Sequence, residues 1–220
     1  PFFSHHICKK PDGSLVLEEE EKAISLFDLT YNEIKDYDCG SRGNERFPDQ
    51  HAMVVSKPSL KDMVTAVNAY CAHNDRAKPF YNIEIKSRPE WYDSIVPAPP
   101  VFVEKLLAEI KDLKIEAQTC IQSFDTRSLL AVNEIDKTIT TAYLIENINP
   151  FGDNMAKLDF IPTIYSPYFQ LVTDTLVQQV HTKGMDLIPW TINEVADMKR
   201  MKALGVDGII TDYPNLIKEL

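Results

Sequence analysis

The chain has 220 residues, which is the length of one large domain or two small ones. Hydrophobic residues make up 44% and charged residues 25%, values that argue against disorder, collagen and coiled coil. The 33 acidic and 23 basic residues give a net charge of −10, so binding to nucleic acid or to an anionic lipid surface is disfavoured, although a local basic site for one phosphate stays open. No run of residues reaches the roughly 18 apolar positions of an integral membrane segment.

Residues 1–50 are polar and show little periodicity, which predicts a long loop region with one short helix near residues 29–37. The cysteines are far apart in the sequence: Cys8, Cys39, Cys71 and Cys120. They lack the spacing of metal ligands, and isolated thiols are the favoured interpretation, with disulfides in a secreted protein as the alternative. A periplasmic or secreted location and a cytoplasmic one are both compatible with the sequence, and no oligomeric state is predicted.

From residue 59 onward, segments with helical spacing alternate with segments typical of strands. Ser59, three residues before Asp62, resembles a capping box and begins a helix whose apolar stripe ends at Cys71. Strands are predicted at 80–86, 115–122, 139–145, 160–165, 186–192 and 206–211. Further helices are predicted near 103–113, 126–135, 169–183, 194–203 and 214–220. Gly184 and Gly205 each stand between a helix and the next strand, as a helix C-terminal cap requires.

Six strands separated mostly by helices predict a parallel sheet with helical crossovers. A doubly wound open sheet and a (β/α)8 barrel both follow this pattern. No glycine-rich turn follows any predicted strand, and polar residues gather where the strands end. The barrel is therefore favoured, although six strands are two short of the number that closes it.

Polar residues alternate with isoleucines along residues 82–86. On a strand, Asn82, Glu84 and Lys86 share one face, and the isoleucines share the other. In a barrel the polar face points inward near the catalytic rim. Since an unpaired buried charge is costly, Glu84 is either a metal ligand or one half of a structural ion pair with Lys86, and the spacing alone does not choose between them.

Polar and aromatic side chains also close the other predicted strands. These segments are Gln-Ser-Phe-Asp at 122–125, Tyr-Ser-Pro-Tyr at 165–168, Pro-Trp-Thr-Ile-Asn at 189–193 and Thr-Asp-Tyr-Pro at 211–214. Taken singly, each has a structural interpretation, with Phe124 and Trp190 in the core and with Asn193 and Asp212 as helix N-caps. Taken together, they predict one polar pocket with aromatic walls at one end of a barrel.

Four motifs, in this order, resemble the glycerophosphodiester phosphodiesterase family. They are Asn-Ile-Glu-Ile-Lys at 82–86, Gln-Ser-Phe at 122–124, Pro-Trp-Thr-Ile-Asn at 189–193 and Gly-Val-Asp-Gly-Ile-Ile-Thr-Asp-Tyr-Pro at 205–214. The resemblance covers nearly the whole chain and implies a single domain, 1–220, in which 1–58 form the family's insertion and loop region and 59–220 form six βα units. It implies an α/β fold, the TIM (β/α)8 barrel of the phospholipase C-like phosphodiesterases.

The resemblance also implies a phosphoric diester hydrolase that converts a small-molecule glycerophosphodiester to sn-glycerol 3-phosphate and an alcohol, with a divalent cation, Mg²⁺ or Ca²⁺, as cofactor. Carried over, Glu84 would be a metal carboxylate and Lys86 would hold the phosphate. Trp190 would border the glycerol, and Gln122 and Phe124 would line the pocket.

Three of the family's motifs are not found among these residues: its His-Arg-Gly, its Glu-x-Asp metal pair and its second catalytic His. In relatives that His directly precedes a proline, and the segment that begins at Pro1 resembles its continuation. We therefore expect the first two βα units to precede Pro1, and we assign no catalytic residue in this chain, with His5 and His6 as loop residues. The alternatives are a phospholipase D-like enzyme on the same barrel and a truncated barrel that binds a ligand without catalysis.

Overall fold

In the computed structural model, which describes residues 2–220, the chain divides into two compact units. Unit 1 contains the residues up to Pro79 and the segment Arg88–Lys114, and unit 2 contains Phe80–Ser87 and Ile115–Leu220. All four motifs of the resemblance, and every candidate site residue named above, belong to unit 2.

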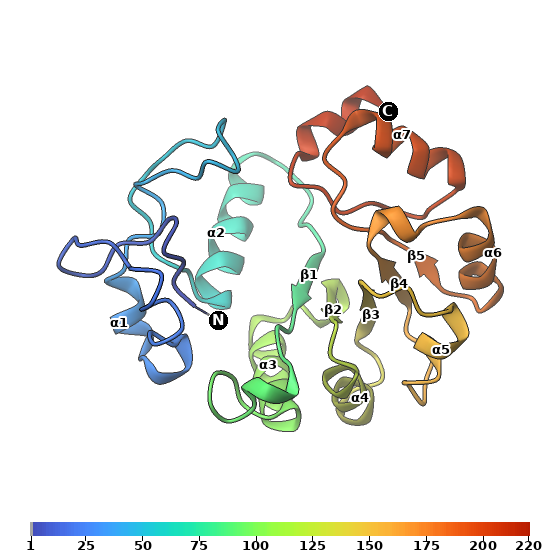
Figure 1. Cartoon of the computed structure of the whole chain (residues 1–220), viewed down its shortest axis with the longest axis horizontal. Helices are drawn as coiled ribbons and strands as arrows, with labels where there is room; N and C mark the ends of the chain where they lie inside the picture. Colours follow the sequence, from blue (N-terminus) through green and yellow to red (C-terminus); the bar gives the residue numbers. More distant parts are fainter. Residues whose placement is uncertain (1) are drawn as a thin grey trace. The chain divides into compact units, whose positions relative to one another are not determined.

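Unit 2 is a parallel sheet with strand order β1-β2-β3-β4-β5, and helices connect successive strands from β2 onward (Figure 1). The strands are β1 Tyr81–Glu84, β2 Thr119–Ser123, β3 Thr140–Ile145, β4 Ile164–Pro167 and β5 Asp186–Leu187. The helices are α4 Thr126–Ile135, α5 Phe151–Met155, α6 Asp174–Thr182 and α7 Val195–Leu204, with short 3-10 helices η3 Glu116–Gln118, η4 Phe169–Leu171 and η5 Pro214–Glu219. The predicted α/β class with parallel strands is confirmed.

The sixth predicted strand is not formed in the described chain. Residues 206–211 instead run beside β5 and the segment after it. The backbone bonds are from Asp207 N–H to the Leu187 carbonyl (3.0 Å), from Ile210 N–H to the Pro189 carbonyl (2.9 Å) and from Ile192 N–H to the Ile210 carbonyl (2.8 Å). Pro189 has no N–H to donate, so a regular ladder cannot continue through it. The prediction of six regular strands was therefore wrong, although the order of the segments was correct.

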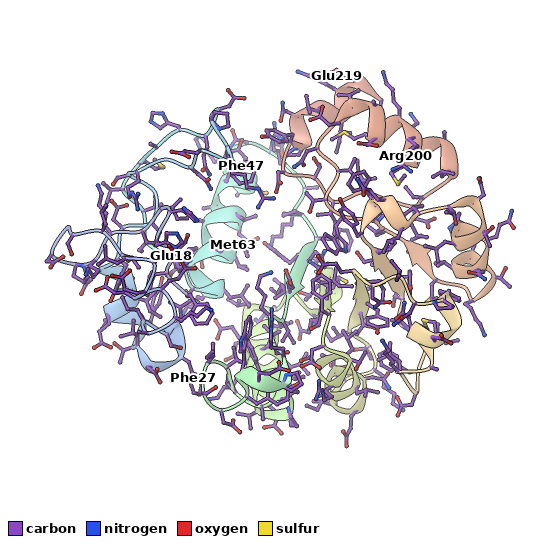
Figure 2. The ribbon with its side chains drawn as sticks, in the orientation of Figure 1. Glu18, Phe27, Phe47, Met63, Arg200 and Glu219 are labelled. Carbon is purple, nitrogen blue, oxygen red and sulfur yellow. A yellow bond between two sulfur atoms is a disulfide. The ribbon has the colours of Figure 1, made fainter. Side chains whose placement is uncertain are left out.

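One hydrophobic core of unit 2 packs between the helices and one face of the sheet. Tyr143 and Ile145 of β3, Tyr165 of β4 and Leu187 of β5 are each 2% exposed or less, and helix residues such as Met198 pack against them. The helix ends agree with the prediction, because Gly184 and Gly205 have positive φ values of 74° and 78°. Figure 2 shows the side chain of Arg200 on α7, whose guanidinium lies 5.7 Å from the ring centroid of Phe169.

Unit 1 contains three α-helices in its described residues: α1 Tyr31–Lys35, α2 Leu60–His73 and α3 Pro99–Leu113. Two 3-10 helices, η1 Leu26–Asp28 and η2 Pro89–Trp91, accompany them. The Ser59 hydroxyl accepts a hydrogen bond from the Asp62 N–H at 3.0 Å, so the predicted start of α2 is confirmed. The short helix predicted near residues 29–37 is confirmed by α1.

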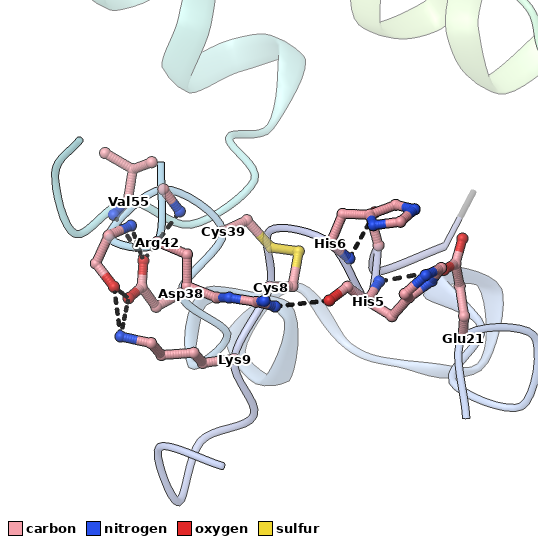
Figure 3. Close-up of a disulfide and its surroundings, with 12 residues drawn as sticks. His5, His6, Cys8, Lys9, Glu21, Asp38, Cys39, Arg42 and Val55 are labelled. Atoms are coloured by element: carbon pink, nitrogen blue, oxygen red, sulfur yellow. Dashed lines mark hydrogen bonds and ion pairs between the residues drawn. A yellow bond between two sulfur atoms is a disulfide. The ribbon is translucent and has the colours of Figure 1, made fainter. Parts of the chain in front are cut away.

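A disulfide joins Cys8 to Cys39 in unit 1 (Figure 3). The favoured interpretation of four isolated thiols was wrong for this pair, while Cys71 and Cys120 are free. The two half-cystines are 31 residues apart in the sequence, and the loops between them carry no periodicity that predicts their approach. Cys8 is fully buried beside Phe3 and Val16, in a small core of this loop-rich region.

The carboxylate of Asp38, the residue before Cys39, organises the loop at the disulfide (Figure 3). It accepts the backbone N–H groups of Gly40 and Ser41, each at 3.0 Å, and also the Ser41 hydroxyl. These bonds, with that of the Ser41 hydroxyl foremost, hold the pKa of Asp38 well below its usual range. The Lys9 N–H donates to the Asp38 carbonyl at 2.7 Å, so the two chain segments are also joined beside the disulfide.

Of the helices in residues 2–220, none is both long enough and apolar enough to cross a lipid bilayer.

Candidate functional site

The first part of the candidate site lies on β1 and β2, on the face of the sheet away from Tyr143 and Tyr165. Register pairs Glu84 with Gln122, and Asn82 donates from Nδ2 to Gln122 Oε1 at 3.0 Å. The predicted alternation is confirmed, since Ile85 is 2% exposed and Asn82 is open to solvent. Both amides are thus positioned by the strands and by each other.

Glu84 and Lys86 form an ion pair on this face, with Lys86 Nζ 2.5 Å from Glu84 Oε2. The Glu84 side chain is 23% exposed and the Lys86 side chain 62% exposed. The partly buried carboxylate of Glu84 is therefore paired with a cation. The Lys86 ammonium still has N–H donors that do not contact this carboxylate and that face solvent. The ion-pair interpretation of Glu84 is present in the structure, and its role as a metal ligand stays a prediction.

The second part of the site is aromatic. The rings of Phe124 and Trp190 meet edge to face at 5.4 Å between centroids, and the Tyr168 ring lies 5.6 Å from that of Trp190. The indole Nε1 of Trp190 donates to the Ser166 carbonyl at 2.9 Å, which fixes the ring plane. Phe124 is 42% exposed, so the core interpretation of this residue was wrong, and it belongs to the rim where β2 ends.

Asn193 and Asp212 do not cap helices, contrary to the structural interpretation of their motifs. The N-cap of α7 is Glu194 and that of η5 is Tyr213. Asn193 Nδ2 instead donates to Asp212 Oδ2 at 2.9 Å, and Asn193 Oδ1 accepts the Asp212 N–H at 3.0 Å. These bonds join the segment after Trp190 to the segment that follows residue 211.

A buried polar cluster behind the rim escaped the sequence analysis. Ser87, Ser123, Asp125 and Ser128 are all 9% exposed or less, and they are joined by hydrogen bonds. The available signal was the position of these residues, since Ser87 directly follows Lys86, and Ser123 and Asp125 flank Phe124. Small polar residues at strand ends are common in loops, so the pattern alone does not predict burial.

Cys120 pairs in register with Asn82 and Thr140, and it lies on the site face toward the amino ends of the strands, away from Lys86 and Phe124. Burial raises the pKa of its thiol to about 12. On the core face, burial and the neighbouring Tyr165 raise the pKa of the Tyr143 hydroxyl to about 12. Neither group is ionised at neutral pH, so neither adds charge to the site.

His5 and His6 lie in unit 1 (Figure 3). A ring nitrogen of His5 pairs with the Glu21 carboxylate, and the Arg42 guanidinium donates to the His5 carbonyl at 2.6 Å. The hydrogen bond from His5 is the main reason why the pKa of Glu21 is lowered. The backbone around His5 and His6 is made of turns, as the sequence analysis expected of loop residues.

Oxygen ligands from carboxylates are what a hard divalent cation needs. Within residues 2–220, no three His, Cys, Asp or Glu side chains come together as a ligand group. Glu84 offers one carboxylate on the site face, and the Gln122 oxygen beside it already accepts a bond from Asn82. These residues fit one ligand of a cation site and not a whole one.

The fold and the site together define a class of protein: a parallel α/β protein with a lysine–carboxylate pair and an aromatic wall at the carboxyl ends of its strands, which is where such sheets bind small ligands. The model of the glycerophosphoryl diester phosphodiesterase family matches residues 12–216. The chain belongs to that family, whose members are phosphoric diester hydrolases, and its fold is of the TIM-barrel type.

Named relatives agree with the family. A glycerophosphodiester phosphodiesterase of Caldanaerobacter subterraneus is 31% identical in a match that covers 95% of this chain and 81% of the relative. One of Bacillus subtilis is 28% identical in a match that covers 95% of this chain and 72% of the relative.

Solved structures show the same fold. A Silicibacter pomeroyi protein assigned to the glycerophosphoryl diester phosphodiesterases has a TM-score of 0.79 at 27% identity, covering 97% of this chain and 73% of that one. A phosphodiesterase from Oleispira antarctica, solved in complex with its product sn-glycerol-3-phosphate, has a TM-score of 0.63 at 17% identity, covering 88% of this chain and 71% of that one.

Proposed function

We propose that this protein hydrolyses glycerophosphodiesters to sn-glycerol 3-phosphate and an alcohol. The observation that carries the proposal is the placement of a lysine and an aromatic wall at the ends of neighbouring strands. Lys86 follows β1, Phe124 follows β2, and Trp190 contacts Phe124. Family membership and the names of the relatives support the same reaction.

In this proposal Lys86 holds the phosphate of the substrate. Its ammonium is a compact charge with three donors, and the side chain is 62% exposed, so it can give up part of its contact with Glu84 to a phosphate oxygen. Gln122, next to Glu84 in register, lines the same face and is oriented by Asn82.

The glycerol moiety lies against Trp190 and Phe124. Glycerol offers a small carbon surface on one side and hydroxyl groups on the other, and an aromatic ring buries the first without competing for the second. The edge-to-face pair keeps both rings in place before the substrate arrives, which lowers the entropy lost on binding.

We propose Glu84 as one ligand of a divalent cation, Mg²⁺ or Ca²⁺. Such a cation, when bound, neutralises charge on the phosphate and polarises it toward attack. No further cation ligand, and no acid or base of the reaction, is assigned among residues 1–220. As in the sequence analysis, residues 1–58 are assigned to the family's insertion and loop region.

The test is release of sn-glycerol 3-phosphate from glycerophosphocholine and glycerophosphoethanolamine by the full natural polypeptide that contains this chain, assayed with Mg²⁺ and with Ca²⁺. We expect the wild type to turn over both substrates. In Lys86→Met the turnover should fall at least tenfold, because the substrate phosphate then lacks the lysine cation that binds it. Turnover of sphingomyelin instead would indicate the phospholipase D-like alternative. Binding of sn-glycerol 3-phosphate with no turnover of any diester would indicate a binding domain and contradict the proposal.

A further inference from the structure

A buried hydrogen-bond network joins the residues that follow β1 to those that follow β2. Its four side chains, Ser87, Ser123, Asp125 and Ser128, are 9%, 0%, 6% and 0% exposed. All four lie in unit 2, and Asp125 is also the N-cap of α4. The network therefore lies at the junction between the carboxyl ends of β1 and β2 and the N-terminus of α4.

Ser123 forms the first link of the network. Its hydroxyl donates to the Ile85 carbonyl at 2.8 Å and accepts the Asp125 N–H at 3.1 Å. One hydroxyl thus bonds across the two strands and also to the turn that follows its own strand. Loss of the buried Ser123 hydroxyl would leave the Ile85 carbonyl and the Asp125 N–H without this hydrogen-bond partner, and that cost favours the bonded arrangement.

Asp125 forms the second link. Its Oδ2 accepts the Ser87 hydroxyl at 3.0 Å, and its Oδ1 accepts both the N–H and the Nε of Arg127, each at 3.1 Å. A buried carboxylate is costly unless all of its oxygens are bonded, and here both are. Since the carboxylate accepts the one hydroxyl proton of Ser87, Ser128 must supply the proton of the 2.9 Å bond between the two serine hydroxyls.

Two of the residues proposed to bind substrate, Lys86 and Phe124, lie directly beside members of this network. Lys86 lies between Ile85, whose carbonyl Ser123 holds, and Ser87, whose side chain Asp125 holds. Phe124 lies between Ser123 and Asp125. The backbone of each substrate residue is therefore fixed on both sides, while its own side chain remains exposed.

We propose that the Ser87–Asp125 hydrogen bond positions Lys86: it fixes the backbone from which the Lys86 side chain reaches the substrate phosphate. The proposal rests on the proposed function, which assigns the phosphate to Lys86. Lysine has a long flexible stem, so its donors meet a phosphate in one place only if the stem starts from a fixed backbone. Small displacements of a binding group cost large factors in rate, which is what such a device prevents.

The experiment is a double-mutant cycle between Ser87→Ala and Lys86→Met in the full-length protein. Affinity for sn-glycerol 3-phosphate is measured by calorimetry, in parallel with kcat and KM for glycerophosphocholine. We expect Ser87→Ala to weaken product binding about tenfold and to have no further effect in Lys86→Met, because the residue that it positions is gone. Ser128→Ala is the matched control. It removes a buried hydroxyl from the same network on the helix side, and binding should stay within about twofold of the wild type.

An equal loss of affinity on Ser87→Ala in both backgrounds, or a Ser128→Ala loss as large as that of Ser87→Ala, would assign the network a structural role and overturn the proposal. If Ser87→Ala does not fold, Ser87→Cys reads the same cycle, since the thiol fills the site of the hydroxyl and is only a weak hydrogen-bond donor. A wild type that binds product through Lys86 but hydrolyses no diester contradicts the proposed function and leaves the cycle readable. A wild type whose binding does not depend on Lys86 contradicts the positioning role.

Discussion

Phe124 and Trp190 follow strands that are not neighbours in the sheet, yet their rings meet edge to face at 5.4 Å. Phe124 follows β2 and Trp190 follows β5, so the contact exists only because the carboxyl ends of the strands face the same way. The contact joins two of the residues that the sequence analysis assigns to the substrate pocket.

We expect Phe124→Leu to raise the KM for glycerophosphocholine about fivefold with little change in the folded state. The substitution removes an aromatic contact of roughly 1 kcal/mol, and Trp190 loses the ring that holds it. Steady-state kinetics and the near-ultraviolet circular dichroism of Trp190 measure the two effects. Phe80→Leu is the matched control, because Phe80, directly before β1, is 81% exposed and its substitution should be neutral. Equal KM values for the two variants would remove Phe124 from the site.

Two explanations of the Glu84 carboxylate fit the structure: it is a metal ligand, or it is one half of a structural ion pair with Lys86. If it is a metal ligand, Glu84→Gln should abolish metal-dependent hydrolysis by the full-length protein and weaken the binding of Mg²⁺ or Ca²⁺, with an unchanged melting temperature. A loss of stability with metal affinity unchanged would instead assign Glu84 to the ion pair with Lys86. Glu134→Gln on α4, which also removes one negative charge, is the control and should behave as the wild type in calorimetry and in the assay.

The Cys8–Cys39 disulfide should stabilise the loop region of unit 1. Closing a loop of 31 residues restricts the unfolded chain by about 3–4 kcal/mol in the entropic model. We expect dithiothreitol to lower the melting temperature and to open residues 9–38 to proteolysis by thermolysin. The Cys8→Ser/Cys39→Ser double variant should already show both effects and should not respond to the reductant, whereas Cys71→Ser should respond like the wild type. A melting temperature that is independent of reductant would show that the disulfide adds no stability.

Much of the fold followed from local signals. The cap at Ser59 and the glycines at 184 and 205 predicted where helices begin and end, and these predictions hold because caps depend on a few adjacent residues. Two other features were predicted wrongly for the opposite reason: the disulfide was not favoured, and the sixth regular strand was expected but does not form. Both depend on which distant segments meet, and a period in the sequence does not encode that.

The strand face on which the proposed site residues lie was predictable from the sequence, and the partners of Asn193, Asp212 and Asp125 were not. Alternation placed Glu84 and Lys86 on one face correctly, since a strand allows only two faces. Asn193 and Asp212 have residue types that suit helix caps, yet they bond to each other because two remote segments run side by side. The burial of Asp125 was likewise not predictable, since it depends on serines from the segment after β1, from β2 and from α4.

Cys120 provides the pH-dependent prediction. Its thiol has an ordinary pKa of 9.0, which burial raises to about 12 in the folded protein. Below pH 9 both the folded and the unfolded chain keep the proton, so the contribution of this group to stability is complete. Between pH 9 and 12 the unfolded chain releases the proton first, and stability falls as the pH rises through this window. The stability of the wild type should therefore fall more steeply above pH 9 than that of Cys120→Ala, as measured by urea unfolding at pH 8 and pH 10.

Labelling with iodoacetamide checks the same shift directly, because only the thiolate reacts. In the Cys71→Ser variant, with the disulfide intact, we expect Cys120 to stay unlabelled at pH 9 in buffer and to be labelled fully in urea, as read by peptide mass spectrometry. The urea sample is the control for reagent and pH. If native Cys120 reacts at pH 9 as fast as it does in urea, its thiol is not shielded in the folded protein, and the expected difference in alkaline stability between the wild type and Cys120→Ala should then be absent.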